Sequence, residues 1–358
     1  MKIIVLFFIL ILCIAGTFSA NISAQDKTHV LPAPNVIPTV TEKMQHAEFW
    51  ISRIDGDPDR VIMTPGQIRD LNRKNSPRLF QGKDINDNPF TYDSTTNRRD
   101  YDGNHYYPEN ALSMSVVSGD SLRTGIKRGC DYVKNGNIYD RRMLPFSEEM
   151  RQEIIDAIDL ESIPNTVYPR YGILTVNTLS RRVPSDMRAY NSRFDWWVDT
   201  FQKLPCETGM PVAILHESRD RDWYYINSEI VFAWVPARNV GVGTLEKVRE
   251  LAEPDDFIVA LAHKVPVYAD RNFTIWITDL YQAARLKLVN TTSEGYRVLL
   301  PFRQEDGSLK AVDGWVKPDA DVSVGYQPYT QRNMINTFFK LLYRPYGGGG
   351  VDHERDCT

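Results

Sequence analysis

The stretch VAILHESRDRDWYYINSEIVFAWVPARNV, residues 212–240, decides the fold of the central part of the chain. Apolar residues alternate or cluster over short runs, and polar turn residues interrupt them at Ser218 to Asp222 and at Asn227-Ser228. Period-two runs of this length, bounded by such residues, are typical of β-strands. The stretch therefore predicts three short strands.

A similar block follows between residues 257 and 322, with a QEDGS turn at residues 304–308. The two blocks end alike, in FAWVPARNV and DGWVKPDADV, so that Trp234 and Trp315 stand in matching contexts 81 residues apart. Repeated blocks of short strands predict two small β-barrels in tandem. We expect both tryptophans to be buried core residues, since buried strand tryptophans explain this pattern without a ligand.

Helical patterns flank the strands. Thr64 and Pro65 suit the first positions of a helix over residues 64–75, and Ser147 is a natural cap for a second helix that ends by Pro164. A third helix is predicted after Thr330 and up to Arg344-Pro345. Its apolar stripe needs a partner to bury against, and the stripe comprises Met334, Ile335, Phe338, Leu341 and Leu342.

Length, charge and composition describe a chain of ordinary folded domains. It has 358 residues, a formal charge of −4 and 42% hydrophobic residues, and it shows no basic cluster suited to nucleic acid. Residues 3–16, IIVLFFILILCIAG, have the length of a secretory signal core. Leu12 precedes Cys13 where a lipoprotein would have a small residue, which favours a cleaved signal over a lipid anchor.

Three cysteines remain after residue 24, at positions 130, 206 and 357. Cys130 and Cys206 could form a disulfide, or both could be buried and reduced, and the sequence leaves the choice open. The histidines lack metal-ligand spacing, so no metal or cofactor is expected. The run from Asp100 to Asn104 has some character of a calcium loop but lacks the distal acidic ligand, which favours a solvated loop.

The chain closes on RPYGGGGVDHERDCT, residues 344–358. Glycines let a backbone approach a substrate closely, and a cysteine at the start of a helix is favoured as the thiolate. By composition alone, a flexible glycine-rich terminus explains this segment better than a reactive-thiol site does.

The order of these features resembles the NlpC/P60 cysteine peptidases that cleave peptidoglycan stem peptides. The motif R-P-Y-G-x-G-G followed by D-C-[S/T] is similar to the entrance of their catalytic domain, and DRVIMTPGQIRDLN at residues 59–72 resembles their N-terminal stabilising domain. The resemblance implies an α+β multidomain chain with a helical N-terminal domain, two SH3-like β-barrels and the start of a papain-like catalytic domain. The boundaries expected are a signal peptide at 1–24, a linker at 25–40, the helical domain at 41–165, barrels at 166–241 and 242–326, and the catalytic segment at 327–358.

The resemblance also assigns roles to residues. Cys357 would be the nucleophile of a γ-D-glutamyl-L-diamino-acid endopeptidase, acting on muropeptides with a free N-terminal L-Ala. Asp356 and Tyr346 would bind the free amine, and Asp199 and Trp196 are candidates from the wall that the first barrel forms. Gly348 replaces the tryptophan that is usual in the glycine motif, and Thr358 replaces serine.

The catalytic histidine of the family lies well downstream of the cysteine, and none of the six histidines of this chain takes its place. His353 is more simply a loop histidine. We therefore expect the 358-residue polypeptide, a truncated form of the family pattern, to be inactive as a peptidase. The alternative is a non-catalytic SH3-like module that binds cell-wall fragments or a protein partner. A periplasmic or secreted location follows from the signal, with no membrane attachment after cleavage and peptidoglycan-derived peptides as partners.

Overall fold

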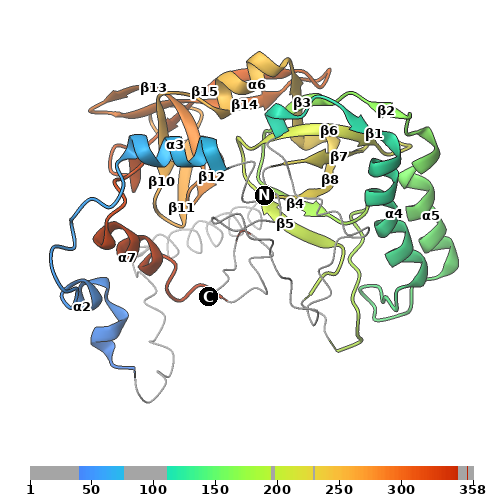
Figure 1. The fold of residues 1–358 in the computed structure, drawn as a ribbon, viewed down its shortest axis with the longest axis horizontal. Coiled ribbons are helices and arrows are strands. Elements are labelled where there is room, and N and C mark those ends of the chain that lie inside the picture. Colours follow the sequence, from blue (N-terminus) through green and yellow to red (C-terminus); the bar gives the residue numbers. More distant parts are fainter. Residues whose placement is uncertain (1–39, 76–110, 195–197, 229, 346–352, 354–358) are drawn as a thin grey trace, which may run out of the picture. The chain divides into compact units, whose positions relative to one another are not determined.

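The computed structural model describes residues 40–75, 111–194, 198–228, 230–345 and 353, and all structural statements concern these residues. The described chain contains helices, two antiparallel sheets of seven strands each and one small sheet of two strands, which confirms the predicted α+β class (Figure 1). The chain divides into two compact units, residues 1–49 and 50–358. None of the helices in the described residues is long and apolar enough to cross a membrane.

The first sheet contains the three strands predicted from residues 212–240, and four more strands complete it. Its strand order is β5-β4-β8-β7-β6-β3-β9, with all pairs antiparallel. The strands are β3 (Arg170–Leu174), β4 (Thr178–Arg181), β5 (Gln202–Cys206), β6 (Pro211–Glu217), β7 (Trp223–Asn227), β8 (Phe232–Pro236) and β9 (Val240–Gly243).

The second sheet has the order β12-β11-β15-β14-β13-β10-β16. Its strands are β10 (Phe257–Ala260), β11 (Lys264–Tyr268), β12 (Trp276–Tyr281), β13 (Arg285–Thr292), β14 (Gly295–Arg303), β15 (Leu309–Val316) and β16 (Val322–Val324). In the QEDGS turn, Gly307 has a φ of 88°, a left-handed conformation that glycine adopts without the strain of a Cβ atom.

The two sheets have the same topology. When the strands of each sheet are numbered in sequence order, each strand of the first sheet has the same neighbours as its counterpart in the second. The matching tryptophans fix the register of the repeat: Trp234 of β8 pairs with Arg181 of β4, and Trp315 of β15 pairs with Tyr268 of β11. Both tryptophans are buried, which confirms the core positions expected from the sequence. Each sheet encloses a cluster of buried apolar side chains of its own.

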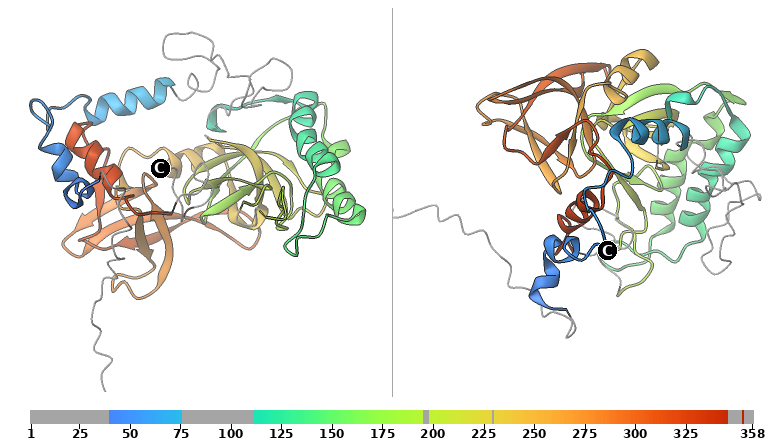
Figure 2. Two further views of the ribbon diagram at one scale, coloured as in Figure 1. Left: turned by 90° about the horizontal axis from the view of Figure 1, so that it is seen from below. Right: turned by 60° about the vertical axis from the view of Figure 1, so that its left-hand side comes forward.

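Two helices, α4 (Gly119–Asn135) and α5 (Glu148–Ile158), pack against each other and against the first sheet. Figure 2 shows them side by side in both further views. The Ser147 side chain accepts a hydrogen bond from the Met150 amide at 3.3 Å, which confirms the predicted cap. Apolar side chains of both helices share a core with Trp234, including Leu122, Ile126, Val133, Ile154 and Ile158. This core holds the helix pair on one face of the first sheet.

Short elements complete this helical region. They are η3 (Ala111–Ser113), β1 (Val117–Ser118), η4 (Leu160–Ser162) and β2 (Thr166–Val167). Strand β1 pairs with β2 in a separate two-stranded sheet. This pairing joins the segment before α4 to the segment that leads into the first seven-stranded sheet.

The N-terminal described residues form η1 (Glu42–Gln45), α2 (Ala47–Ile51) and α3 (Pro65–Asn75). At the start of α3, Thr64 and Gln67 exchange hydrogen bonds between side chain and backbone, at 2.8 and 3.2 Å, as in a capping box. Met63 forms an isolated antiparallel bridge with Tyr329, just before the C-terminal helix. This bridge places the start of α3 beside the chain that leads into that helix.

The C-terminal helix α7 (Gln331–Phe339) starts after Thr330, whose hydroxyl accepts a hydrogen bond from the Asn333 amide at 3.1 Å. The helix ends before the predicted position, and a turn follows in which Tyr343 has a φ of 70°. No residue of α7 is fully buried, and Phe338 and Leu342 of the predicted stripe are exposed. Within the described chain, the stripe therefore lacks the burial that its pattern predicts.

Candidate functional site

Four of the predicted site residues, Cys357, Asp356, Tyr346 and Trp196, lie outside the described residues. The Asp100 to Asn104 run also lies outside them. In the C-terminal segment 344–358, Arg344, Pro345 and His353 are described, and Arg344 and His353 lie against the second sheet. They show where the chain that leads to the predicted nucleophile is held.

His353 lies between the two sheets. Its Nε2 atom is 3.3 Å from the Glu207 carboxylate, at the end of β5 in the first sheet, and its side chain is 9% exposed. Its ring lies 4.6 Å from the Tyr281 ring of β12 in the second sheet, with 32° between the planes. A loop histidine was expected here, and the structure shows that this loop residue has a buried ring in contact with both sheets.

Arg344 makes a second contact of the same segment. Its guanidinium contacts the His263 ring, which packs edge-on against Tyr281 at 5.5 Å. His263, Tyr281, Glu207, Arg344 and His353 are called the seam here. Because the seam residues come from both sheets and from the C-terminal segment, the seam fixes that segment relative to both barrels.

A polar cluster beside the seam joins the two sheets directly. Asn177, between β3 and β4, donates to the Asp279 carbonyl of β12 at 2.7 Å, and its own amide oxygen accepts from the Thr208 backbone at 3.0 Å. The hydroxyls of Thr208 and Thr278 are 3.4 Å apart. Buried polar groups of this kind need their partners, so the cluster favours one arrangement of the two sheets.

Asp199, a predicted substrate-binding residue, is buried. Its carboxylate is 2.6 Å from the Arg181 guanidinium, and the two side chains are 7% and 9% exposed. It also accepts hydrogen bonds from the amides of Ala189 and Phe201, at 3.2 and 3.0 Å. The charge of Asp199 is thus balanced by Arg181, and the pair ties down the loop that precedes β5. Its role toward a substrate stays a prediction.

The two described cysteines are free and buried, so the structure decides for reduced cysteines and against a disulfide between Cys130 and Cys206. Burial raises the pKa of the Cys130 thiol to about 11 and that of the Cys206 thiol to about 12. A thiol with so high a pKa is a poor nucleophile at neutral pH, because the thiolate is the reactive form. We therefore expect neither Cys130 nor Cys206 to act as a nucleophile at neutral pH.

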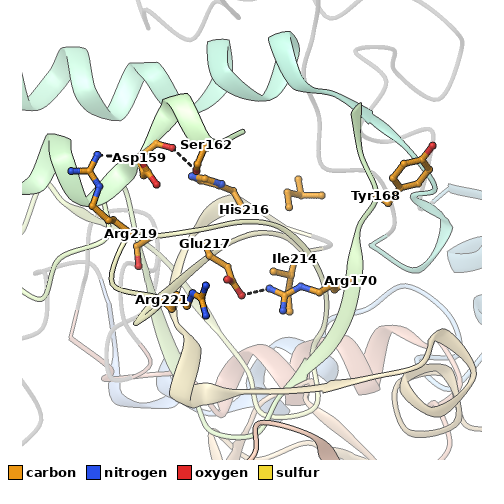
Figure 3. A pocket seen from close by; sticks show the side chains of 11 residues that line it. Asp159, Ser162, Tyr168, Arg170, Ile214, His216, Glu217, Arg219 and Arg221 are labelled. Carbon is orange, nitrogen blue, oxygen red and sulfur yellow. Dashed lines mark hydrogen bonds and ion pairs between the residues drawn. The ribbon is translucent and has the colours of Figure 1, made fainter. Parts of the chain in front are cut away.

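No group of three or more metal-ligating side chains occurs in the part of the chain that the structure describes. A separate pocket of about 430 Å³ lies on the first sheet, between β6 and the segment that follows α5 (Figure 3). Arginine and carboxylate side chains line much of it. Sequence reasoning missed this pocket, although the alternating charges of the turn SRDRD, residues 218–222, mark one of its walls.

Comparison with known proteins connects this geometry to one fold. An SH3 domain model of the SH3b1 type matches residues 192–236, which include β5 to β8 of the first sheet. A solved NlpC/P60 endopeptidase from Photobacterium damselae subsp. piscicida superposes with a TM-score of 0.63 at 19% identity, over 86% of this chain and 64% of that chain. The chain thus spans less than two thirds of that protein's length. Over most of its own length it shares the fold of an NlpC/P60 endopeptidase.

A solved NlpC/P60 family protein from Bacillus cereus ATCC 10987 also matches, with a TM-score of 0.37 at 17% identity, over 49% of this chain and 65% of that one. A search of curated proteins finds no match to the sequence. The comparisons thus show an SH3 domain of the SH3b1 type within the first sheet and a fold similar to that of an NlpC/P60 endopeptidase.

Proposed function

We propose that this protein processes peptidoglycan stem peptides, as a relative of the γ-D-glutamyl-L-diamino-acid endopeptidases. The observation that carries the proposal is the fold shared with an NlpC/P60 endopeptidase, together with the C-terminal motif that ends in Asp356-Cys357-Thr358. The seam supports it, because His353 holds the chain near this motif against both sheets. Export by the N-terminal signal would bring the protein to its substrate in the periplasm or outside the cell.

In this proposal Cys357 takes the place of the family's nucleophile, whose thiolate would attack the γ-carbonyl of D-glutamate, form a thioester and release the amine of the diamino acid. Asp356 and Tyr346 would bind the free amine of L-Ala. Asp199 and Trp196 would contribute from the first barrel. Asp199 would act through its buried pair with Arg181, by fixing the loop before β5.

We further propose that the 358-residue polypeptide binds such peptides without hydrolysing them. Three described histidines are already engaged: His216 with the Ile158 carbonyl at 2.8 Å, and His263 and His353 in the seam. Unless a base takes its proton, a cysteine with an ordinary pKa of about 8.5 is largely protonated at neutral pH. The alternative hypothesis is a non-catalytic module that binds cell-wall fragments or a protein partner. The two seven-stranded sheets of the repeat support it.

The test is incubation of the polypeptide with L-Ala-γ-D-Glu-diaminopimelate, followed by chromatography of the products and by calorimetric measurement of binding. We expect binding and no cleavage. Turnover that Cys357→Ala abolishes would refute the inactivity of this polypeptide while supporting the endopeptidase assignment. Absence of both binding and turnover would overturn the proposal as a whole.

A further inference from the structure

The pocket on the first sheet has a wall of arginines that the proposed peptidase chemistry does not use (Figure 3). Arg170 belongs to β3, and Arg219 and Arg221 belong to the turn between β6 and β7. The other lining residues are Asp159, Ser162, Tyr168, Ile214, Leu215, His216, Glu217 and Ser218. The three arginines are the groups from which a ligand can be inferred.

Two of the three arginines already hold a carboxylate. Arg170 pairs with Glu217, and Arg219 donates to Asp159 at 3.1 Å. The hydrogen bond from Arg219 lowers the pKa of Asp159 below its usual value, so this pair stays charged at neutral pH. In each pair one guanidinium nitrogen contacts one carboxylate oxygen.

Arg221 has no ion-pair or hydrogen-bond partner for its side chain among the described residues, and it is exposed. Its φ of 65° places it in the left-handed region, which a non-glycine residue adopts at a cost. The neighbouring Asp220 carboxylate is turned into the loop, where it accepts from the Asp222 amide at 3.0 Å and from the Ser218 hydroxyl. The guanidinium of Arg221 is therefore available to a ligand.

The histidine of the pocket adds no charge. Burial lowers the pKa of His216, whose Nε2 atom lies 2.8 Å from the Ile158 carbonyl oxygen. Its ring packs edge-on against Trp234, with 5.8 Å between ring centroids. Three arginines against two carboxylates leave the lining with one net positive charge.

We propose that this pocket binds a carboxylate of an acidic peptide, with Arg221 as the principal contact. This inference rests on the proposed function, and it names a second contact for the same class of substrate. Tyr168, which is 74% exposed at the rim, offers a ring face and a hydroxyl to the rest of the peptide. The carboxylates of Glu217 and Asp159 disfavour a dianion such as phosphate more than a single carboxylate, because repulsion grows with ligand charge.

The internal repeat provides a comparison within the chain. The turn of the second sheet that corresponds to residues 218–222 joins β13 to β14 through Ser293 and Glu294, and it contains no arginine. Of two turns at the same place in one topology, only the one in the first sheet thus carries arginines. The arginines are therefore a property of this pocket and are not required by the fold.

The experiment measures peptide binding by calorimetry for three forms of the full chain: wild type, Arg221→Gln and Arg141→Gln. Arg141 is an exposed arginine outside the pocket lining, so its variant matches the change in net charge. The ligands are L-Ala-γ-D-Glu-diaminopimelate, the same peptide with its carboxylates amidated, and inorganic phosphate. Circular dichroism and thermal unfolding check that each variant is folded.

We expect Arg221→Gln to weaken binding of the peptide about tenfold, a typical loss for a charge-assisted contact. Arg141→Gln should bind like the wild type, and amidation of the peptide should weaken binding to both of these forms but not to Arg221→Gln. Equal affinities of the two variants, or equal binding of the amidated peptide, would overturn the proposal. Phosphate that binds as tightly as the peptide and is lost in Arg221→Gln would also overturn it, by assigning the pocket to phosphate.

Binding to purified peptidoglycan sacculi separates this inference from the proposed function. The wild type and Arg221→Gln could bind sacculi with equal affinity and also bind the peptide with equal affinity. That result would be consistent with the proposed function and would show that the pocket does not contribute to it. A wild-type chain that binds neither sacculi nor peptide would reject both.

Discussion

The two sheets share one strand order, yet the same edge is buried in the first and exposed in the second. Gln202 of β5 pairs with Arg181, and Trp276 of β12 pairs with Tyr268, so Phe201 and Ile275, which precede them, are equivalent. Phe201 is 0% exposed and Ile275 is 60% exposed. Phe201 packs against Tyr132 of α4 and against Phe146, and the second sheet has no equivalent contact among the described residues. Equivalent residues of one topology can therefore be buried or exposed, and the elements packed against each sheet determine the outcome.

Truncating each of the two equivalent residues, Phe201 and Ile275, tests this difference in burial most directly. We expect Phe201→Ala to lower the free energy of unfolding by about 3–5 kcal/mol, because it opens a cavity in the core shared with α4 and α5. Ile275→Ala should change it by less than about 0.5 kcal/mol, since the side chain is exposed. Urea denaturation measures both values. Equal losses for the two variants would show that the second edge is covered in solution.

A loss of comparable size is expected for the buried pair of the first sheet. Asp199→Ala leaves Arg181 buried without its counter-charge, which costs about 3–5 kcal/mol in typical cases. Tyr268 stands in place of Arg181 in the second sheet, so no such pair is needed there. Thermal unfolding measures the change. A variant as stable as the wild type would show that the pair is not needed for stability. That result would favour the substrate-binding role predicted for Asp199.

Lys203 gives the first sheet a dependence on pH. Burial lowers its pKa to about 8, and its amine donates to the Phe232 carbonyl at 2.6 Å. Between this pKa and its usual value of about 10.5, the unfolded chain binds more protons than the folded chain, so the contribution of Lys203 to stability rises with pH. The equivalent position in the second sheet is occupied by Ile277.

Lys203→Met isolates this effect. From pH 8 to 10.5, we expect the unfolding free energy of the wild type to rise relative to the variant by at most about 3 kcal/mol. The raised pKa values of Cys130 and Cys206 act in the opposite direction above pH 9, but they are present in both proteins and cancel in the difference. Urea denaturation across this range provides the values, and a constant difference would contradict the buried position of the amine.

The smallest effect is expected at the seam. A double-mutant cycle of Glu207→Gln and His353→Gln should give a coupling energy of about 1 kcal/mol, because the contact is largely shielded from water. The control is the exposed pair Arg238–Asp186 at 3.7 Å, for which surface ion pairs predict a coupling below about 0.5 kcal/mol. Equal coupling in both cycles would argue that His353 does not hold the C-terminal segment in solution.

Several elements followed from local sequence. Caps at Ser147 and Thr330, the alternation in residues 212–240 and the matched ends at Trp234 and Trp315 all predicted elements that the structure contains. Helix α4 was not singled out, because its three glycines weaken helix propensity. A Cβ atom at Gly129 would lie 2.9 Å from the Arg182 carbonyl oxygen, so close packing against the first sheet explains that glycine.

The candidate site likewise has features that the sequence predicted and features that only the tertiary structure shows. Sequence alone predicted the repeat of two sheets and the helical caps, because each is a local pattern of residue types. The nucleophile motif, which rests on a family resemblance, lies outside the described residues and stays a prediction. Sequence alone could not predict that His353 contacts Glu207 and Tyr281 or that Asp199 is balanced by Arg181. Nor could it predict that Arg221 lines a pocket, with no partner for its side chain among the described residues. These contacts join residues up to 146 positions apart in the chain, and burial and charge pairing at such distances depend on how the sheets and helices pack.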